Sequence, residues 1–95
     1  YYGAISDYTK AIEINPNDGD AYFNRGNAKR KLKDYYGAIS DYTKAIEINP
    51  NYALAFANRG AAKEVMGDMQ GACDDWRKAS YLGNESAAKW VRNQC

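Results

Sequence analysis

Residues 1–17, YYGAISDYTKAIEINPN, occur a second time without a mismatch as residues 35–51, and this duplication decides the fold. The offset between the two copies is 34 residues. A diverged third copy, MQGACDDWRKASYLGN, begins at Met69 in the same register. The segments between the copies also align, with AYFNRGNAKRKLKD starting at Ala21 and AFANRGAAKEVMGD starting at Ala55. A fixed period of this length predicts a repeat architecture in which each repeat packs on its neighbours.

Each period contains two helical patterns. Apolar residues of the segment 37–48 recur at helical spacing, and the charged residues left on the outer side are Asp41, Lys44 and Glu47. Residues 49–51, Asn-Pro-Asn, end this helix because proline disfavours helical geometry in the residue before it. Residues 20–32 are predicted to form the opposing helix, and residues 33–34 form the turn between the two.

The composition excludes several classes of function. The net charge of +1 lacks the basic excess that nucleic acids and anionic membranes require, so we predict no nucleic-acid partner. No apolar run approaches the roughly 20 residues that cross a bilayer, which predicts no membrane span. The chain has no histidine, the commonest general base and metal ligand, and its two cysteines are too few for a zinc site. We therefore expect neither catalysis nor a cofactor.

The helix–turn–helix period resembles the tetratricopeptide repeat family over essentially the whole chain. In one copy the family's pattern of large and small residues is filled by Tyr22, Gly26, Ala38, Tyr42, Ala45 and Pro50. In the next copy it is filled by Phe56, Gly60, Ala72, Trp76 and Ala79. The sequence departs from the pattern at Arg25 and Arg59, which replace a leucine, and at Lys29 and Lys63, which replace a tyrosine. Their aliphatic stems are expected to cover apolar neighbours while the charges reach water.

The resemblance implies an all-α fold, an α-α superhelix (solenoid) of antiparallel helix pairs with a 34-residue period. We expect a single domain over residues 1–95, built from the second helix of a truncated repeat, two full repeats and a capping helix. The respective ranges are 1–18, 19–52, 53–83 and 84–95. The apolar stripe of the segment 1–15 lacks the first helix that would cover it. We expect either that another chain covers it, by dimerisation or end-to-end stacking, or that it lies bare or frays; the stripe is formed by Ala4, Ile5, Tyr8 and Ala11.

In this family the first helix of each pair lines the concave face and binds peptides, which implies a protein–protein interaction scaffold with a polypeptide partner. The lining implied for the first full repeat is Asp20, Phe23, Asn24, Asn27, Arg30 and Lys31. The lining implied for the next repeat is Leu54, Ala57, Asn58, Ala61, Glu64 and Val65. Asparagine suits peptide contact because its amide both donates and accepts hydrogen bonds. The alternative for Asn24 and Asn58 is that they only satisfy polar groups of the repeats themselves.

Some family members grip the carboxylate that ends a partner's tail with lysine, asparagine and arginine. Asn24 and Asn27 match the asparagine positions of that clamp, whereas Phe23, Leu54 and Asn58 stand where cations would be expected. The clamp is therefore incomplete in this chain. The alternative to peptide binding is a structural spacer or a self-association module within a longer protein.

Two side-chain pairings follow from the antiparallel arrangement. Arg25 and Asp41 lie at mirrored distances from the turn between their helices, which predicts a salt bridge, with Asp7 as the alternative partner of Arg25. Arg59 and Asp75 repeat this geometry one period later.

Cys73 and Cys95 form the second predicted pairing. Counting outward from the turn near residues 83–84 places Gln94 or Cys95 opposite Cys73, which brings the two thiols toward the Cα separation of about 5.5–6 Å that a disulfide needs. In a reducing compartment both thiols would instead stay free.

Overall fold

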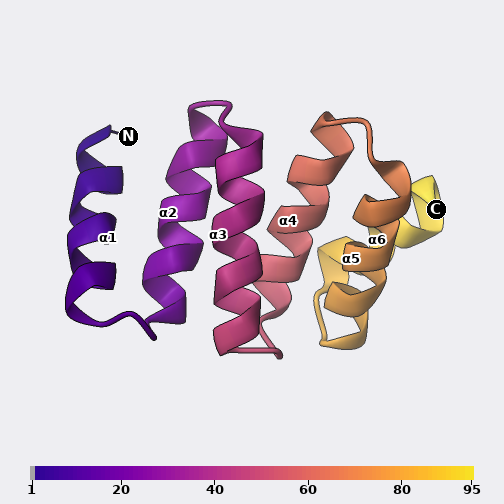
Figure 1. The fold of residues 1–95 in the computed structure, drawn as a ribbon. Helices are drawn as coiled ribbons and strands as arrows, with labels where there is room; N and C mark the ends of the chain where they lie inside the picture. Colours follow the sequence, from indigo (N-terminus) through magenta and orange to yellow (C-terminus); the bar gives the residue numbers. More distant parts are fainter. Residues whose placement is uncertain (1) are drawn as a thin grey trace.

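The computed structural model describes residues 2–95, so Tyr1, the first residue of the duplicated segment, lies outside the described residues. Within that range the chain forms helices and no strand. The helices are α1 (Tyr2–Ile14), α2 (Gly19–Lys31), α3 (Tyr35–Ile48), α4 (Ala53–Val65), α5 (Met69–Tyr81) and α6 (Glu85–Gln94). Each packs mainly on the next one along the chain, which gives an elongated molecule of 40 × 25 × 17 Å (Figure 1). This architecture is the all-α solenoid that the sequence predicts.

Side-chain caps fix where several helices begin. The residues before α2, α3, α5 and α6 each accept a hydrogen bond from the backbone N–H three residues later, and they are Asp18, Asp34, Asp68 and Asn84. Such a cap satisfies a backbone donor that has no partner within the helix. The turn after α2 places Lys33 in the left-handed region at φ 66°, where the turns after α4 and α5 use Gly67 and Gly83.

Small residues on one helix face large rings on the next, and these contacts form the core. Tyr42 and Trp76 are the largest fully buried side chains. A Cβ added at Gly26 would lie 2.9 Å from Cε1 of Tyr42, and one added at Gly60 would lie 2.6 Å from Nε1 of Trp76. Each glycine therefore allows an aromatic ring to lie directly against the helix backbone.

The two predicted salt bridges are confirmed, and both involve a buried carboxylate. Arg25 donates to Asp41 through Nε at 2.8 Å and Nη2 at 2.7 Å, and Arg59 binds Asp75 in the same way at 2.9 and 2.7 Å. Asp41 is only 3% exposed and Asp75 only 4%. The alternative bridge from Arg25 to Asp7 does not form. Instead, Nη1 of Arg25 donates to Thr9 of α1 at 3.3 Å.

Two expectations about charged residues were wrong. Asp41 does not lie on the outer side of its helix, because Arg25 from α2 neutralises it inside the interface. The charges of Lys29 and Lys63 also pair with carboxylates rather than extending freely into water: the ammonium groups lie 3.1 and 3.0 Å from Asp41 and Asp75, and each lysine side chain is 22% exposed. Each buried carboxylate thus has two cationic partners, which offset the cost of removing it from water.

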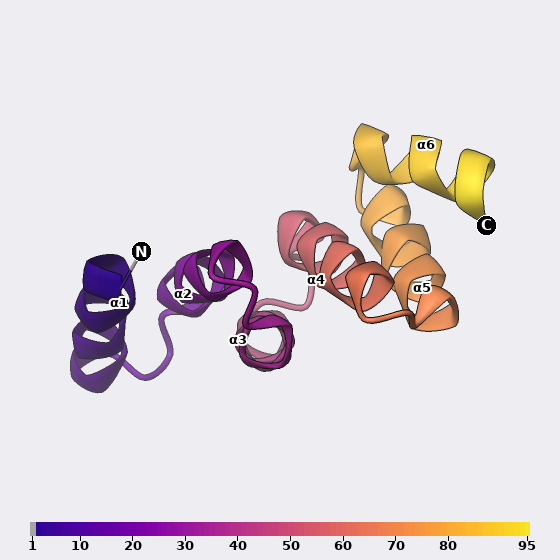
Figure 2. The same ribbon diagram turned by 90° about the horizontal axis from the view of Figure 1, so that it is seen from above.

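The α6 helix closes the C-terminal end of the solenoid by packing on α5 (Figure 2). Ala87 is fully buried there, and the rings of Trp76 and Trp90 lie 5.4 Å apart. A disulfide joins Cys73 of α5 to Cys95, with a Cα separation of 5.9 Å. The antiparallel geometry that the sequence predicts therefore brings the two cysteines within bonding distance.

Candidate functional site

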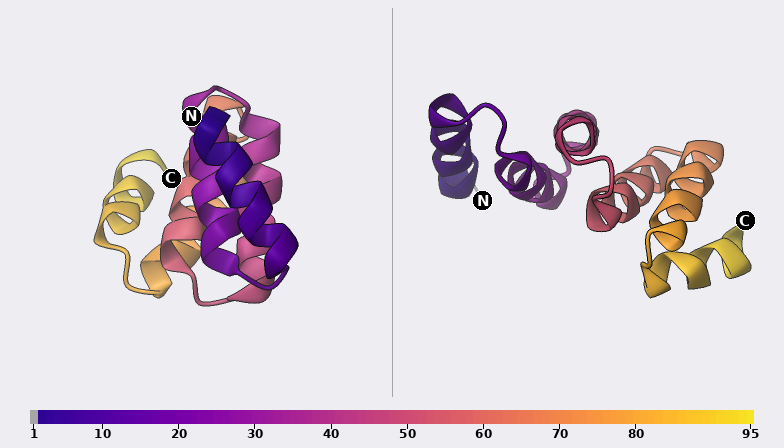
Figure 3. Two further views of the ribbon diagram at one scale, coloured as in Figure 1. Left: turned by 90° about the vertical axis from the view of Figure 1, so that its left-hand side faces the viewer. Right: turned by 90° about the horizontal axis from the view of Figure 1, so that it is seen from below.

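The α2 and α4 helices lie on the same side of α3 and contact each other directly (Figures 2 and 3). All twelve residues of the predicted peptide-binding lining lie on these two helices. We call the surface that they share the α2–α4 face.

A cavity of about 310 Å³ opens between the C-terminal ends of α2 and α4. Five of its six lining residues belong to the predicted set, and they are Arg30, Lys31, Ala61, Glu64 and Val65. The sixth, Tyr35, begins α3 and was not predicted, because the family pattern considers only the first helix of each pair. Its place directly after the tight turn was the available signal, since that turn keeps it beside the end of α2.

The cavity combines two cations with one carboxylate. Nε of Arg30 is buried and has no hydrogen-bond partner among residues 2–95. The same guanidinium lies near the buried hydroxyl of Tyr42. Burial raises the pKa of Tyr42 above its ordinary value, and Arg30 opposes that shift only in part. The phenol of Tyr42 is therefore neutral at ordinary pH.

Tyr52, directly before α4, packs at the N-terminal end of the α2–α4 face. Its ring lies 4.8 Å from that of Phe23, and its hydroxyl donates to Asp20 at 2.8 Å. Burial, followed by the hydrogen bond to Asp20, raises the pKa of Tyr52. Phe23 and Asp20 thus contribute to the packing between repeats, whereas Leu54 is exposed.

Three of the predicted lining residues are engaged in hydrogen bonds or core packing within the repeats themselves. Asn27 accepts hydrogen bonds from the hydroxyl of Tyr42 and, at 2.9 Å, from Nδ2 of Asn58. Ala57 lies in the core at 2% exposure, so its methyl group faces the interior rather than the open face. By contrast, the half-buried Asn24 forms no side-chain hydrogen bond with any residue that the structure describes. Asn24 therefore remains the amide of this face with its full hydrogen-bonding capacity.

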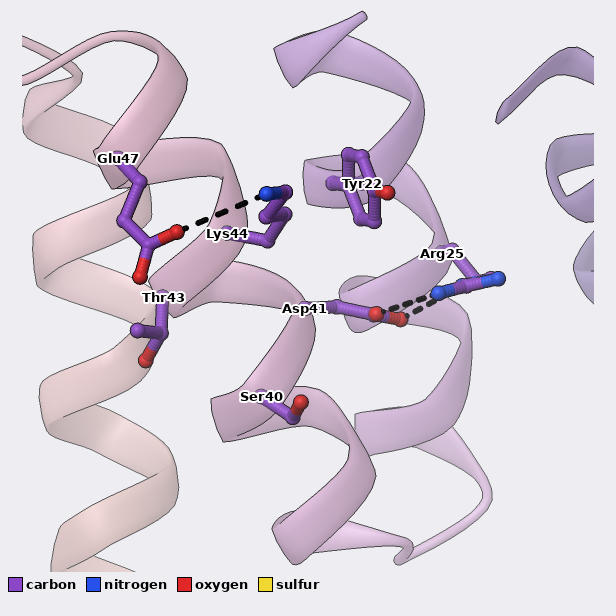
Figure 4. Close-up of a pocket in the computed structure, with 7 residues that line it drawn as sticks. All are labelled: Tyr22, Arg25, Ser40, Asp41, Thr43, Lys44 and Glu47. Atoms are coloured by element: carbon purple, nitrogen blue, oxygen red, sulfur yellow. Dashed lines mark hydrogen bonds and ion pairs between the residues drawn. The ribbon is translucent and has the colours of Figure 1, made fainter. Parts of the chain in front are cut away.

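A second hollow, of about 380 Å³, lies over α2 and α3 (Figure 4). Its charged groups neutralise one another: Arg25 binds Asp41, and Lys44 lies 3.7 Å from Glu47. Tyr22, Ser40 and Thr43 complete the lining. The charges of this hollow are paired within the chain, whereas five of the six residues that line the cavity between α2 and α4 are ones the sequence predicts for peptide contact, so the α2–α4 face is the better candidate site.

Residues 2–95 contain neither a membrane-spanning helix nor a cluster of metal-ligating side chains. Among the helices from residue 2 onward, none is both long and apolar enough to cross a membrane. Across the same residues, no group of three or more His, Cys, Asp or Glu side chains is placed to hold a metal ion.

Stacked antiparallel helix pairs with an open face define a helical repeat protein, and comparison with known sequences identifies its kind. The family described as Tetratricopeptide repeat matches residues 19–52, and the one described as TPR repeat matches residues 1–33. No curated protein sequence matches the chain.

Solved structures agree with this assignment. The first TPR of Spaghetti (RPAP3), bound to the HSP90 peptide SRMEEVD, is 30% identical with a TM-score of 0.87, over 93% of this chain and 71% of that one. The Arabidopsis OM64 TPR domain is 31% identical with a TM-score of 0.87, over 93% and 74%. The structure of MamA, at 22% identity and a TM-score of 0.88 over 92% and 52%, shows the shared fold alone. The chain belongs to the tetratricopeptide repeat family and is a protein–protein interaction module.

Proposed function

We propose that the α2–α4 face binds a peptide segment of a partner protein and that the cavity between α2 and α4 receives a carboxylate of that segment. The observation that carries this proposal is the cavity itself. It places the guanidinium of Arg30 beside Lys31 in a concave site between two helices. A carboxylate would accept charge-assisted hydrogen bonds there, which are stronger than those between neutral groups.

The rest of the face supplies the other contacts that a peptide needs. Asn24 offers a donor and an acceptor to a peptide backbone, and the exposed Leu54 and Val65 offer apolar surface. The charge of Glu64 in the same cavity opposes part of the attraction that Arg30 and Lys31 exert on a carboxylate, so we expect a segment with a single acidic group at this point.

The relative that was solved with the HSP90 peptide SRMEEVD supports peptide binding on this fold. The cations of this chain are arranged differently from the carboxylate clamp, since Phe23, Leu54 and Asn58 occupy the positions where the clamp carries cations. We therefore propose a polypeptide partner for this chain, but we do not propose that this partner is the HSP90 peptide.

Selection of binders from a displayed library of random peptides tests the proposal. We expect Asn24→Ala, whose side chain has no partner to lose, to fold normally and to weaken the selected peptides about tenfold. Neutralising Arg30 with Arg30→Gln should weaken peptides that carry a carboxylate more than their amide counterparts. Lys44→Ala, on the exposed side of α3, is the matched control and should leave affinity unchanged.

The alternative is a structural spacer or self-association module. It predicts that no library peptide binds saturably, or that Asn24→Ala and Arg30→Gln bind the selected peptides as the unaltered chain does.

A further inference from the structure

A third cavity, of about 380 Å³, opens at the edge of the solenoid where α4 turns into α5. It lies between the N-terminal end of α3 and the C-terminal end of α4 (Figure 1). It shares no lining residue with the cavity of the α2–α4 face and is therefore a separate site. We call it the edge cavity, and the residues that line it are Tyr36, Ile39, Lys63, Met66 and Asp68.

The edge cavity carries one carboxylate that no salt bridge neutralises. Asp68 is exposed, and among residues 2–95 no cation pairs with it. Its Oδ1 accepts the hydrogen bond from the backbone N–H of Gly71 that caps α5, so Oδ2 is the oxygen left for a ligand. The cation of the cavity is already bound, because the ammonium of Lys63 lies 3.0 Å from Asp75. The charge that the cavity offers to a ligand is therefore negative.

The walls of the edge cavity combine an open aromatic ring with apolar groups. Tyr36 is 77% exposed, so most of its ring is accessible, and an accessible tyrosine ring attracts a cation over its face. Met66 is 37% exposed and Ile39 is half-buried. A thioether and an aliphatic side chain are surfaces on which the CH2 groups of a long side chain can pack. The side chain that matches the whole cavity thus has an aliphatic stem and a positively charged end.

The chain itself shows which cation this chemistry holds. The guanidinium of Arg25 lies 5.5 Å from the centroid of the Tyr22 ring and at the same time binds the carboxylate of Asp41. Arg59 repeats this arrangement one period later. A planar guanidinium can stack on a ring while it donates to a carboxylate, whereas the ammonium of lysine is a more strongly hydrated point charge. Arginine is therefore the better match to the edge cavity.

We infer that the edge cavity binds an arginine side chain of a partner polypeptide. The stem of that arginine packs on Ile39 and Met66. Its guanidinium lies over the ring of Tyr36 and donates to Oδ2 of Asp68. This preference for a cation is opposite to that of the α2–α4 face, for which we propose a carboxylate, so the two sites take different groups and neither inference depends on the other.

A short peptide with a single arginine, acetyl-Ala-Arg-Ala-amide, is the probe. We expect it to shift the resonances of Tyr36, Met66 and Asp68 saturably when it is titrated into the isotope-labelled chain and followed by NMR. The same peptide with lysine in place of arginine should bind more weakly. The peptide with uncharged norleucine should bind about fivefold to tenfold more weakly, because it keeps the aliphatic stem but loses both the ion pair and the cation–π contact.

Asp68→Asn isolates the charge of the edge cavity. Asparagine keeps the side-chain oxygen that caps α5, so the variant should fold normally and bind the arginine peptide about threefold to fivefold more weakly. Asp18→Asn is the matched control, since Asp18 caps α2 in the same way at the opposite edge of the solenoid (Figure 1). It should bind the peptide as the unaltered chain does.

Three results would overturn the inference. The first is the absence of saturable shifts at Tyr36, Met66 and Asp68, including the case in which the arginine peptide shifts other residues instead. The second is equal affinity of the arginine and norleucine peptides, since the cavity would then recognise only an apolar stem. The third is equal affinity of the Asp68→Asn and Asp18→Asn variants for the arginine peptide.

Discussion

The buried carboxylate of Asp75 provides the sharpest test of how the repeats are held together. It is 4% exposed and accepts hydrogen bonds from Arg59 at 2.7 and 2.9 Å, with the ammonium of Lys63 at 3.0 Å. Asp75→Ala would leave two cations facing each other without a counter-charge. Removing one partner of a buried pair costs about 3–5 kcal/mol. The side chains of Arg59 and Lys63 are 17% and 22% exposed and can partly rehydrate, so we expect the lower end, about 3 kcal/mol.

For a chain of this size, a loss of about 3 kcal/mol corresponds to a fall in Tm of roughly 12 °C or more, which circular dichroism during thermal unfolding would measure. Asp74→Ala is the matched control, since Asp74 is 65% exposed and its one salt bridge within residues 2–95 is to Arg77 of its own helix. The control should change the free energy of unfolding by less than about 0.5 kcal/mol. Equal effects of the two substitutions would refute the argument that burial makes this pairing important.

Gly60→Ala should destabilise the chain by about 1–3 kcal/mol in denaturant unfolding, because the new Cβ would lie 2.6 Å from Nε1 of Trp76. Gly3→Ala in α1 meets nothing within 4 Å, so it should be neutral or stabilising by up to about 1 kcal/mol, and a similar loss at both sites would contradict the packing argument. Cys95→Ser should lower stability by about 3 kcal/mol, since the disulfide closes a loop with a sequence separation of 22, and added reductant should then have no further effect on Tm. The pKa of Tyr52 is raised in the folded chain by burial and its acidic neighbour, so its contribution to stability is complete below about pH 10 and is lost as the pH rises further. Tyr52→Phe should therefore show a smaller fall in unfolding free energy between neutral and strongly alkaline pH; an unchanged fall would argue against that shift.

The period and the antiparallel turns made the fold and several pairings predictable from sequence. A 34-residue repeat with a short turn between its helices fixes which residues lie opposite each other, so Arg25 could be paired with Asp41 by counting alone. The same counting brought Cys73 and Cys95 together. Both arguments need only the backbone arrangement, which the repeat determines.

Side-chain direction and neighbouring helices account for what the sequence did not reveal. Helical periodicity predicted Asp41 on the outer side of its helix. Periodicity within one helix does not show that Arg25 of α2 lies opposite Asp41 and pairs with its carboxylate. Ala57 was assigned to the open face although its methyl group is buried in the core, since side-chain direction on a helix turns by about 100° from one residue to the next. Tyr35 and Tyr52 were missed because they lie outside the two helices that the family pattern assigns to the face.

The position of a bound peptide on the chain tests the central claim most directly. We suggest titrating the isotope-labelled chain with a library-selected peptide while recording amide and asparagine side-chain resonances by NMR. Binding to the α2–α4 face predicts saturable shifts at Asn24, Arg30 and Glu64, with those of Lys44 and Glu47 unchanged. Shifts confined to the exposed side of α3, with no change at Asn24 or Arg30, would contradict the account.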